Sequence, residues 1–242
     1  METLILSIAF FFAALLYSSV GHAGASAYLA AMAIVGISSE TMRPTALAMN
    51  ILVSALVIYR FNKANLVNWK RILPFIAGSI PAAFIGGSLS LNTESYNTIV
   101  GIVLLLVAIG LFFNAKAVER QKFRLTLPIA VIAGLALGLL SGLTGTGGGI
   151  FLTPLLIFAG WASAKQAAGL SAVFIFANST SGLLGNLTSF QYLPPQLPIW
   201  LLVVVIGALL GSYFGANKLH NPALKRALAL VLIIASFKLI FL

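Results

Sequence analysis

Long runs of apolar residues, separated by short polar stretches, dominate this chain. A membrane-spanning helix needs about 20 apolar residues, with a working range of roughly 17–25. Eight runs are long enough to span a bilayer, and two short runs each follow a long run after a glycine cluster. The long runs cover residues 4–20, 44–59, 72–91, 96–114, 127–144, 166–185, 198–215 and 222–242, and the short runs cover 27–37 and 150–160.

This pattern predicts an all-α polytopic membrane protein with eight long transmembrane helices and two short half-helices. A helix satisfies its own backbone hydrogen bonds in lipid, so we expect almost no strand. One boundary has a local signal, since Ser163 and Gln166 fit a capping box that opens the run 166–185. Of the 242 residues, 60% are hydrophobic and 7% are charged, whereas a soluble domain carries roughly 25% charged residues. So few charges exclude a soluble enzyme, a nucleic-acid-binding domain and a disordered chain.

Several kinds of chemistry lack the residues that they need. The chain has no cysteine, which excludes thiol redox chemistry and cysteine-ligated metals. No cluster of His, Asp and Glu has the spacing of metal ligands, and no glycine cluster forms a P-loop. We therefore expect no enzymatic activity, no metal and no cofactor. The four acidic residues lie away from the middle of the apolar runs, so a cavity between the helices would suit an anion better than a cation.

An internal repeat emerges when the sequence is aligned with itself at an offset of 124 residues. Over residues 4–114 and 128–238, 22 of 111 positions are identical, about twice the number expected from shared apolar composition. The matches include residues at breaks, such as Gly21 with Gly145 and Pro74 with Pro198. We predict a first transmembrane repeat at 1–115, a cytoplasmic linker at 116–126 and a second repeat at 127–242, integrated into one membrane domain.

Equivalent loops of the two repeats differ in charge. Residues 60–71 carry four Lys or Arg residues and the equivalent 184–195 carry none, whereas the loop at Glu94 is net negative and its counterpart near 218–226 is positive. Because loops rich in Lys and Arg stay in the cytoplasm, this pattern predicts an inverted-topology repeat, which is typical of secondary transporters. The stretches 60–71, 116–124 and 218–226 are then cytoplasmic, and both termini are external. A parallel duplication without inversion is the alternative.

The two glycine-rich breaks, residues 18–26 and 141–149, form the strongest candidate site. Glycines interrupt a helix, and the helix that restarts presents free N–H groups and the positive end of its dipole. Two such ends meeting near the midplane would bind an anion, although small residues also serve close helix packing. The expected substrate-binding residues in and beside the breaks are Ser19, Gly21, His22, Gly24, Thr144, Gly145, Thr146, Gly147 and Gly148.

Polar residues inside other runs extend this candidate site. Asn50 and Ser54 lie four positions apart on one helix face, and Asn178 and Ser179 belong to a polar cluster in the run 166–185. Such side chains are costly in lipid and should face the interior. There they either contact the substrate or make hydrogen bonds between helices.

Three residues with a charge or a titratable ring offer further roles. Arg43 and Lys165 precede equivalent runs, and they either line the two mouths of an anion pathway or extend to the lipid–water interface. His22 either relays a proton or serves only as a hydrogen-bonding group.

The break at 142–149, followed by Thr153 and Pro154, resembles the glycine-rich break and helix start of the TauE/SafE family of sulfite exporters and toluene-sulfonate uptake permeases. Residues 168–172 look like that family's small-residue helix start, whereas the first break, 21–25, has fewer glycines and departs from the pattern. The resemblance implies a secondary transporter for small sulfur-containing anions, such as sulfite, sulfoacetate or other organosulfonates. It also implies outward transport in many members, ion coupling in some, and a bacterial or archaeal inner membrane.

Two other functions fit the same pattern of residues. A passive anion channel would share the site but would not accumulate its substrate, and a membrane accessory subunit would transport nothing itself. The expected partners are a small anion, the lipid bilayer and, where transport is coupled, protons. The sequence indicates no oligomeric state.

Overall fold

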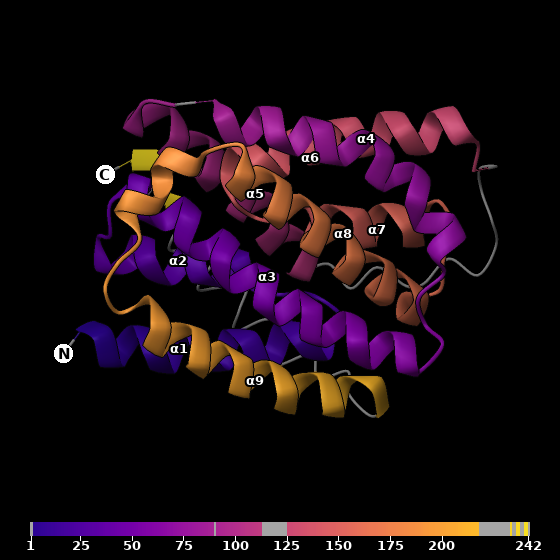
Figure 1. The fold of residues 1–242 in the computed structure, drawn as a ribbon, viewed down its shortest axis with the longest axis horizontal. Helices are drawn as coiled ribbons and strands as arrows, with labels where there is room; N and C mark the ends of the chain where they lie inside the picture. Colours follow the sequence, from indigo (N-terminus) through magenta and orange to yellow (C-terminus); the bar gives the residue numbers. More distant parts are fainter. Residues whose placement is uncertain are drawn as a thin grey trace.

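The computed structural model describes residues 2–89, 91–112 and 125–217, together with residues 233, 236, 237, 240 and 241. This part of the chain forms an elongated bundle of helices without a strand (Figure 1). The helices are α1 (Glu2–Ser19), α2 (Ala25–Val35), α3 (Ser39–Lys63), α4 (Trp69–Ser88), α5 (Thr93–Phe112), α6 (Leu127–Thr144), α7 (Gly149–Phe158), α8 (Ala164–Leu184), the 3-10 helix η1 (Leu187–Tyr192) and α9 (Leu197–Asn217).

Six of the described helices are long and apolar enough to cross a membrane, namely α1, α3, α4, α6, α8 and α9. This confirms the all-helical polytopic class. The two runs expected to be short form α2 and α7, which have 11 and 10 residues. The run 222–242 and the linker 116–126 lie almost entirely outside the described residues, as do the charged stretches 116–124 and 218–226.

Helices α3 and α8 occupy the middle of the bundle and are its most deeply buried long helices. They lie side by side and antiparallel, since Asn50 meets Ser179 while Leu47, earlier in α3, lies beside Gly182. In the register of the internal repeat, α3 and α8 are equivalent helices. Polar side chains on either helix therefore face the interior of the protein rather than lipid.

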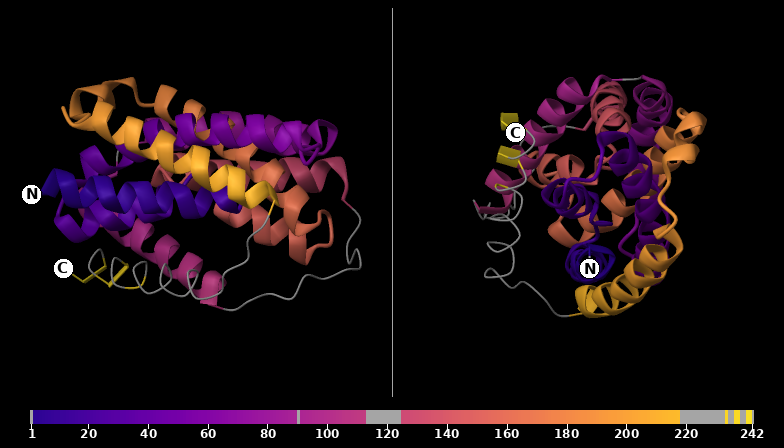
Figure 2. Two further views of the ribbon diagram at one scale, coloured as in Figure 1. Left: turned by 90° about the horizontal axis from the view of Figure 1, so that it is seen from below. Right: turned by 90° about the vertical axis from the view of Figure 1, so that its left-hand side faces the viewer.

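Two close helix pairs flank this centre, α1 with α9 on one side and α4 with α6 on the other (Figures 1 and 2). Each pair runs parallel and approaches through glycine. A methyl group at Gly142 would lie 2.2 Å from the carbonyl oxygen of Ala83, and one at Gly207 would lie 2.5 Å from that of Phe11. Small residues thus hold these membrane-spanning helices in direct backbone contact.

Candidate functional site

The second glycine-rich break separates α6 from α7 and is a true interruption of the helix. Gly145, Gly147 and Gly148 have φ angles of +79°, +77° and +74°, in the left-handed region that only glycine occupies without strain. Gly148 is the N-cap of α7 and offers no side chain to cap it. No side chain therefore caps the first N–H groups of α7, which face the break. Uncapped N–H groups at the start of a helix are a common binding site for anions.

The first break separates α1 from α2 in the equivalent position. Gly21 and Gly24 also have positive φ angles, and Gly24 is an N-cap without a capping side chain. Both glycines pack closely: a methyl group at Gly21 would lie 2.4 Å from the Cβ of Ala168, and one at Gly24 would lie 2.9 Å from the Tyr28 ring. Both expected helix breaks are therefore present, and close packing accounts for the glycines of the first.

His22 connects the first break to the second repeat. Its Nε2 lies 2.8 Å from the hydroxyl of Thr153 and 3.2 Å from the carbonyl oxygen of Gly149, at the start of α7. The Thr153 hydroxyl in turn lies 2.7 Å from that of the buried Ser171 in α8. A chain of three polar side chains thus runs from one repeat into the other.

Gly147 faces two of the predicted polar residues. A methyl group at Gly147 would lie 2.8 Å from Asn50 Nδ2 and 3.1 Å from Ser179 Oγ. Asn50 Nδ2 itself donates a hydrogen bond of 3.3 Å to Ser179 Oγ, and both side chains are completely buried. The structure therefore brings together the second break, α3 and α8 at one point inside the bundle.

Several buried polar atoms of α3, α6 and α8 have no hydrogen-bond partner in the described part of the chain. They include Asn50 Oδ1, both amide atoms of Asn178 and Ser141 Oγ. Ser141 lies beside Gly148, and Asn178 is one helical turn from Phe174, whose ring also packs against Gly148. An unsatisfied buried polar group costs roughly 1–3 kcal/mol. We call Asn50, Ser141, Asn178 and Ser179 the polar cluster, and a ligand or water would satisfy its unpaired groups.

Three predicted hydroxyl groups bond instead to the backbone of their own helices. Ser19 donates to Leu16 O at 2.6 Å, and Ser54 donates to Asn50 O at 2.5 Å. Thr144 donates to Leu140 O at 2.7 Å and also lies 2.9 Å from the hydroxyl of Thr146. These bonds occupy the hydroxyl protons of Ser19, Ser54 and Thr144, and the Thr146 hydroxyl contacts that of Thr144 within the second break.

Arg43 and Lys165 occupy different environments although both begin long helices. Lys165 is exposed. Arg43 is buried, and its guanidinium donates to the carbonyl oxygens of Gly86 at 2.7 Å, Leu89 at 3.2 Å, and Gly87. A methyl group at Gly145 would lie 3.2 Å from Arg43 Cγ, so Arg43 also packs against the second break.

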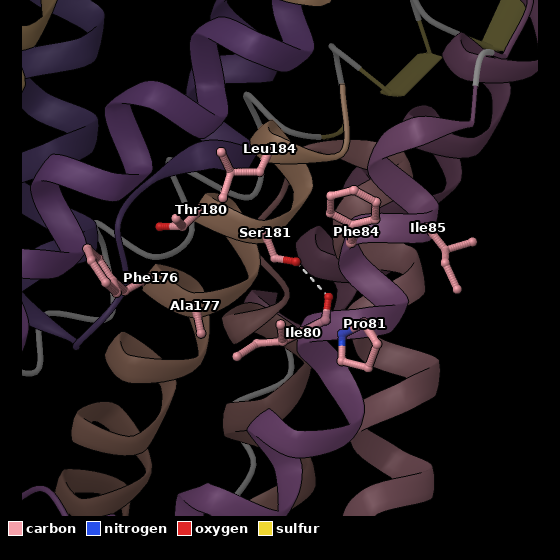
Figure 3. A pocket seen from close by; sticks show the side chains of 9 residues that line it. All are labelled: Ile80, Pro81, Phe84, Ile85, Phe176, Ala177, Thr180, Ser181 and Leu184. Atoms are coloured by element: carbon pink, nitrogen blue, oxygen red, sulfur yellow. Dashed lines mark hydrogen bonds between the residues drawn. The ribbon is translucent and has the colours of Figure 1, made fainter. Parts of the chain in front are cut away.

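An open groove of about 700 Å³ lies between α4 and α8 (Figure 3). None of the predicted binding residues lines it, and its one hydrogen bond drawn in Figure 3 runs from Ser181 Oγ to Ile80 O at 2.6 Å. Its lining is almost wholly apolar, so an anion has little to bind there. The lining residues are Ile80, Pro81, Phe84, Ile85, Phe176, Ala177, Thr180, Ser181 and Leu184.

Residues 6–239 match the family model for the sulfite exporter TauE/SafE. The chain belongs to this family. It is 38% identical to the probable membrane transporter protein y4hK of Sinorhizobium fredii over 99% of both chains. It is 26% identical to the probable membrane transporter protein YunE of Bacillus subtilis, over 74% of this chain and 72% of YunE. No solved structure matches the chain significantly.

The TauE/SafE match confirms the resemblance seen in the sequence, and together with the six apolar helices it makes this chain a multi-pass membrane protein of a transporter family. A further relative, the probable membrane transporter protein MamO of Paramagnetospirillum magneticum, is 28% identical over 77% of this chain but only 36% of its own length. Sequence reasoning missed Ser141, Thr153 and Ser171 as site residues. Each lies inside or beside a glycine-rich or small-residue motif, and that position is the signal that could have found it.

Proposed function

We propose that this TauE/SafE protein is a secondary transporter that exports small sulfur-containing anions, such as sulfite, sulfoacetate or other organosulfonates, across the inner membrane. The observation that carries this proposal is the buried polar cluster, in which Asn50 and Ser179 meet at Gly147 and Asn178, next to Ser179 in α8, has an unpaired amide. The family description supplies the substrate class.

The charges of the described residues favour an anion at this point. The three acidic residues in the described part of the chain, Glu2, Glu40 and Glu94, are all exposed. The polar cluster instead contains the amide nitrogen of Asn178, which is an unpaired hydrogen-bond donor. The positive end of the α7 dipole adds to the attraction for an anion. The oxygens of a sulfite or a sulfonate accept such hydrogen bonds, and charged acceptors make the stronger ones.

The packing of the helices supports alternating access through an inverted repeat. The equivalent helices α3 and α8 lie antiparallel, as inversion requires. Exchanging the two repeats also converts the pair of α4 with α6 into the pair of α9 with α1. In our proposal one repeat rocks against the other around the polar cluster. The positively charged loop 60–71 lies in the cytoplasm and both termini lie outside.

Flux measurements in proteoliposomes test this function. Purified protein is reconstituted, and uptake of radiolabelled sulfite and sulfoacetate is followed with and without an imposed pH gradient. The proposal predicts accumulation above the external concentration when the gradient is present. Equilibration without accumulation would favour a passive anion channel. No flux of either anion under any gradient would reject the substrate class and favour an accessory subunit.

A further inference from the structure

Arg43 is a charged side chain buried at one end of a transmembrane helix. Only 7% of its surface is exposed, and charges within membrane helices are costly and usually functional. The acidic residues in the described part of the chain, Glu2, Glu40 and Glu94, are all exposed. Neutral carbonyl groups rather than a carboxylate therefore receive the hydrogen bonds of its guanidinium that we describe.

The contacts of Arg43 hold several elements together at this end of the bundle. Its guanidinium joins the first turns of α3 to the carbonyl oxygens of Gly86, Gly87 and Leu89, at the end of α4. The last carbonyl groups of a helix carry its partial negative charge, which favours a cation there. The Tyr96 hydroxyl of α5 donates to Thr144 O at 3.2 Å, within the second break. The second break is thus enclosed by α3, α4 and α5.

The two ends of the bundle are not equivalent in this respect. The residue that corresponds to Arg43 in the second repeat is Ala167, whose methyl side chain cannot donate a hydrogen bond. At the first break Val20 and His22 are partly exposed, whereas Thr144, Gly145 and the glycines that follow are buried. The second break, which packs against Arg43, is therefore the more deeply buried of the two breaks.

We propose that Arg43 is a latch that closes one end of the bundle and that an anion releases. This inference rests on the proposed transport of anions. Its guanidinium holds one end shut through the α4 carbonyl groups, and it exchanges those groups for the oxygens of the anion when that end opens. A guanidinium forms two parallel hydrogen bonds with an oxyanion, and these are stronger than its bonds to neutral carbonyl oxygens. The hydrogen bonds to the arriving anion therefore offset the loss of the carbonyl hydrogen bonds that break when this end opens. Arg43 acts here as both the substrate's cationic partner and the gate.

Thiol labelling tests the latch directly, because the chain contains no cysteine of its own. Thr45→Cys places a nearly isosteric reporter two residues from Arg43, at a position that is fully buried. Val20→Cys places a second reporter at the partly exposed first break. A membrane-impermeant maleimide is applied to either side of reconstituted vesicles, and the labelling rate of each full-length variant is measured.

The latch predicts that Thr45→Cys is protected and Val20→Cys is labelled from one side. Adding Arg43→Gln should raise the Thr45→Cys rate about tenfold, from the opposite side, since a minor open state becomes a major one. Sulfite should raise the same rate in the protein that retains Arg43. Arg43→Lys keeps the positive charge but lacks the planar guanidinium that donates to several carbonyl groups at once. It should raise the labelling rate of Thr45→Cys less than Arg43→Gln does.

A matched control is Arg71→Gln, because Arg71 also donates to a backbone carbonyl, that of Trp161, but at the far end of α3 and α4. This variant should leave the Thr45→Cys rate unchanged. An unchanged rate in both Arg43→Gln and Arg43→Lys would overturn the latch. A raised rate in these variants, with no effect of sulfite on the original Arg43 protein, would reject the anion as its operator. The rate without sulfite does not depend on which anion is transported, so failure of the substrate class and failure of the latch are distinguishable.

Discussion

The imidazole Nε2 of His22 lies 2.8 Å from the hydroxyl of Thr153, and this contact joins the two repeats. His22 comes from the break between α1 and α2, whereas Thr153 belongs to the short helix α7. If one repeat moves against the other, this hydrogen bond must either break or keep His22 and Thr153 together as the repeats move. An imidazole can both accept and release a proton, which makes His22 a candidate for proton coupling.

We predict that His22→Gln uncouples transport from the pH gradient. Glutamine retains a hydrogen-bonding group for Thr153 but does not titrate. Exchange of labelled for unlabelled sulfite should continue, while accumulation driven by the gradient should disappear. Uptake in proteoliposomes with and without the gradient measures both quantities. Full accumulation by His22→Gln would restrict His22 to a hydrogen-bonding role.

Gly147→Ala should reduce transport about tenfold or more, because the added methyl group meets Asn50 and Ser179 and the residue must keep a positive φ angle. Gly182→Ala is the matched control. Its methyl group would make only ordinary contacts of 3.4 Å or longer, and alanine favours a helix interior. Initial uptake rates, normalised to the amount of inserted protein, compare the two variants. Equal uptake rates in Gly147→Ala and Gly182→Ala would show that Gly147 is not part of the binding site.

Asn178→Leu separates a binding role from a structural one. The amide of Asn178 is fully buried and has no hydrogen-bond partner among the residues that the structure describes. Replacing it with an apolar side chain of similar size removes a cost of roughly 1–3 kcal/mol. Thermal unfolding in detergent should therefore begin at the same or a higher temperature, while sulfite transport falls. A variant with retained transport would show that Asn178 does not contact the substrate.

Ser171→Ala tests the last of the three hydrogen-bonded side chains His22, Thr153 and Ser171. Its hydroxyl lies 2.7 Å from that of Thr153, and alanine fits the same space. We expect uptake without a gradient to change little and uptake driven by the gradient to fall. The variant loses the hydrogen bond between Thr153 and residue 171, which continues the row of polar side chains from His22 into α8. A uniform loss of both activities would instead indicate a structural role for Ser171.

The helices and their interruptions could be predicted because they follow from local sequence. The length of an apolar run determines whether a helix can span lipid, and both glycine-rich breaks and the short α2 and α7 occur where expected. The capping box of Ser163 and Gln166 is also present. The 3-10 helix η1 (Leu187–Tyr192) was not predicted, because one so short leaves no periodic pattern.

The candidate site could be predicted only in part, because its geometry depends on contacts between distant segments. The sequence shows that Asn50 and Ser179 are costly in lipid, but not that they meet each other beside Gly147. Arg43 illustrates the limit more clearly. A charge at the end of an apolar run resembles a solvated flank, and only the fold brings the last carbonyl groups of α4 to its guanidinium. Orientation, inversion and the binding role of each residue stay predictions.

Calorimetric titration of sulfite into the purified protein and into Asn178→Leu tests the central claim most directly. The account predicts saturable binding by the original protein and an affinity about tenfold lower in the variant, which corresponds to about 1.4 kcal/mol of lost binding free energy. Equal affinities in two folded proteins, or no binding to either, would contradict an anion site at the polar cluster of Gly147.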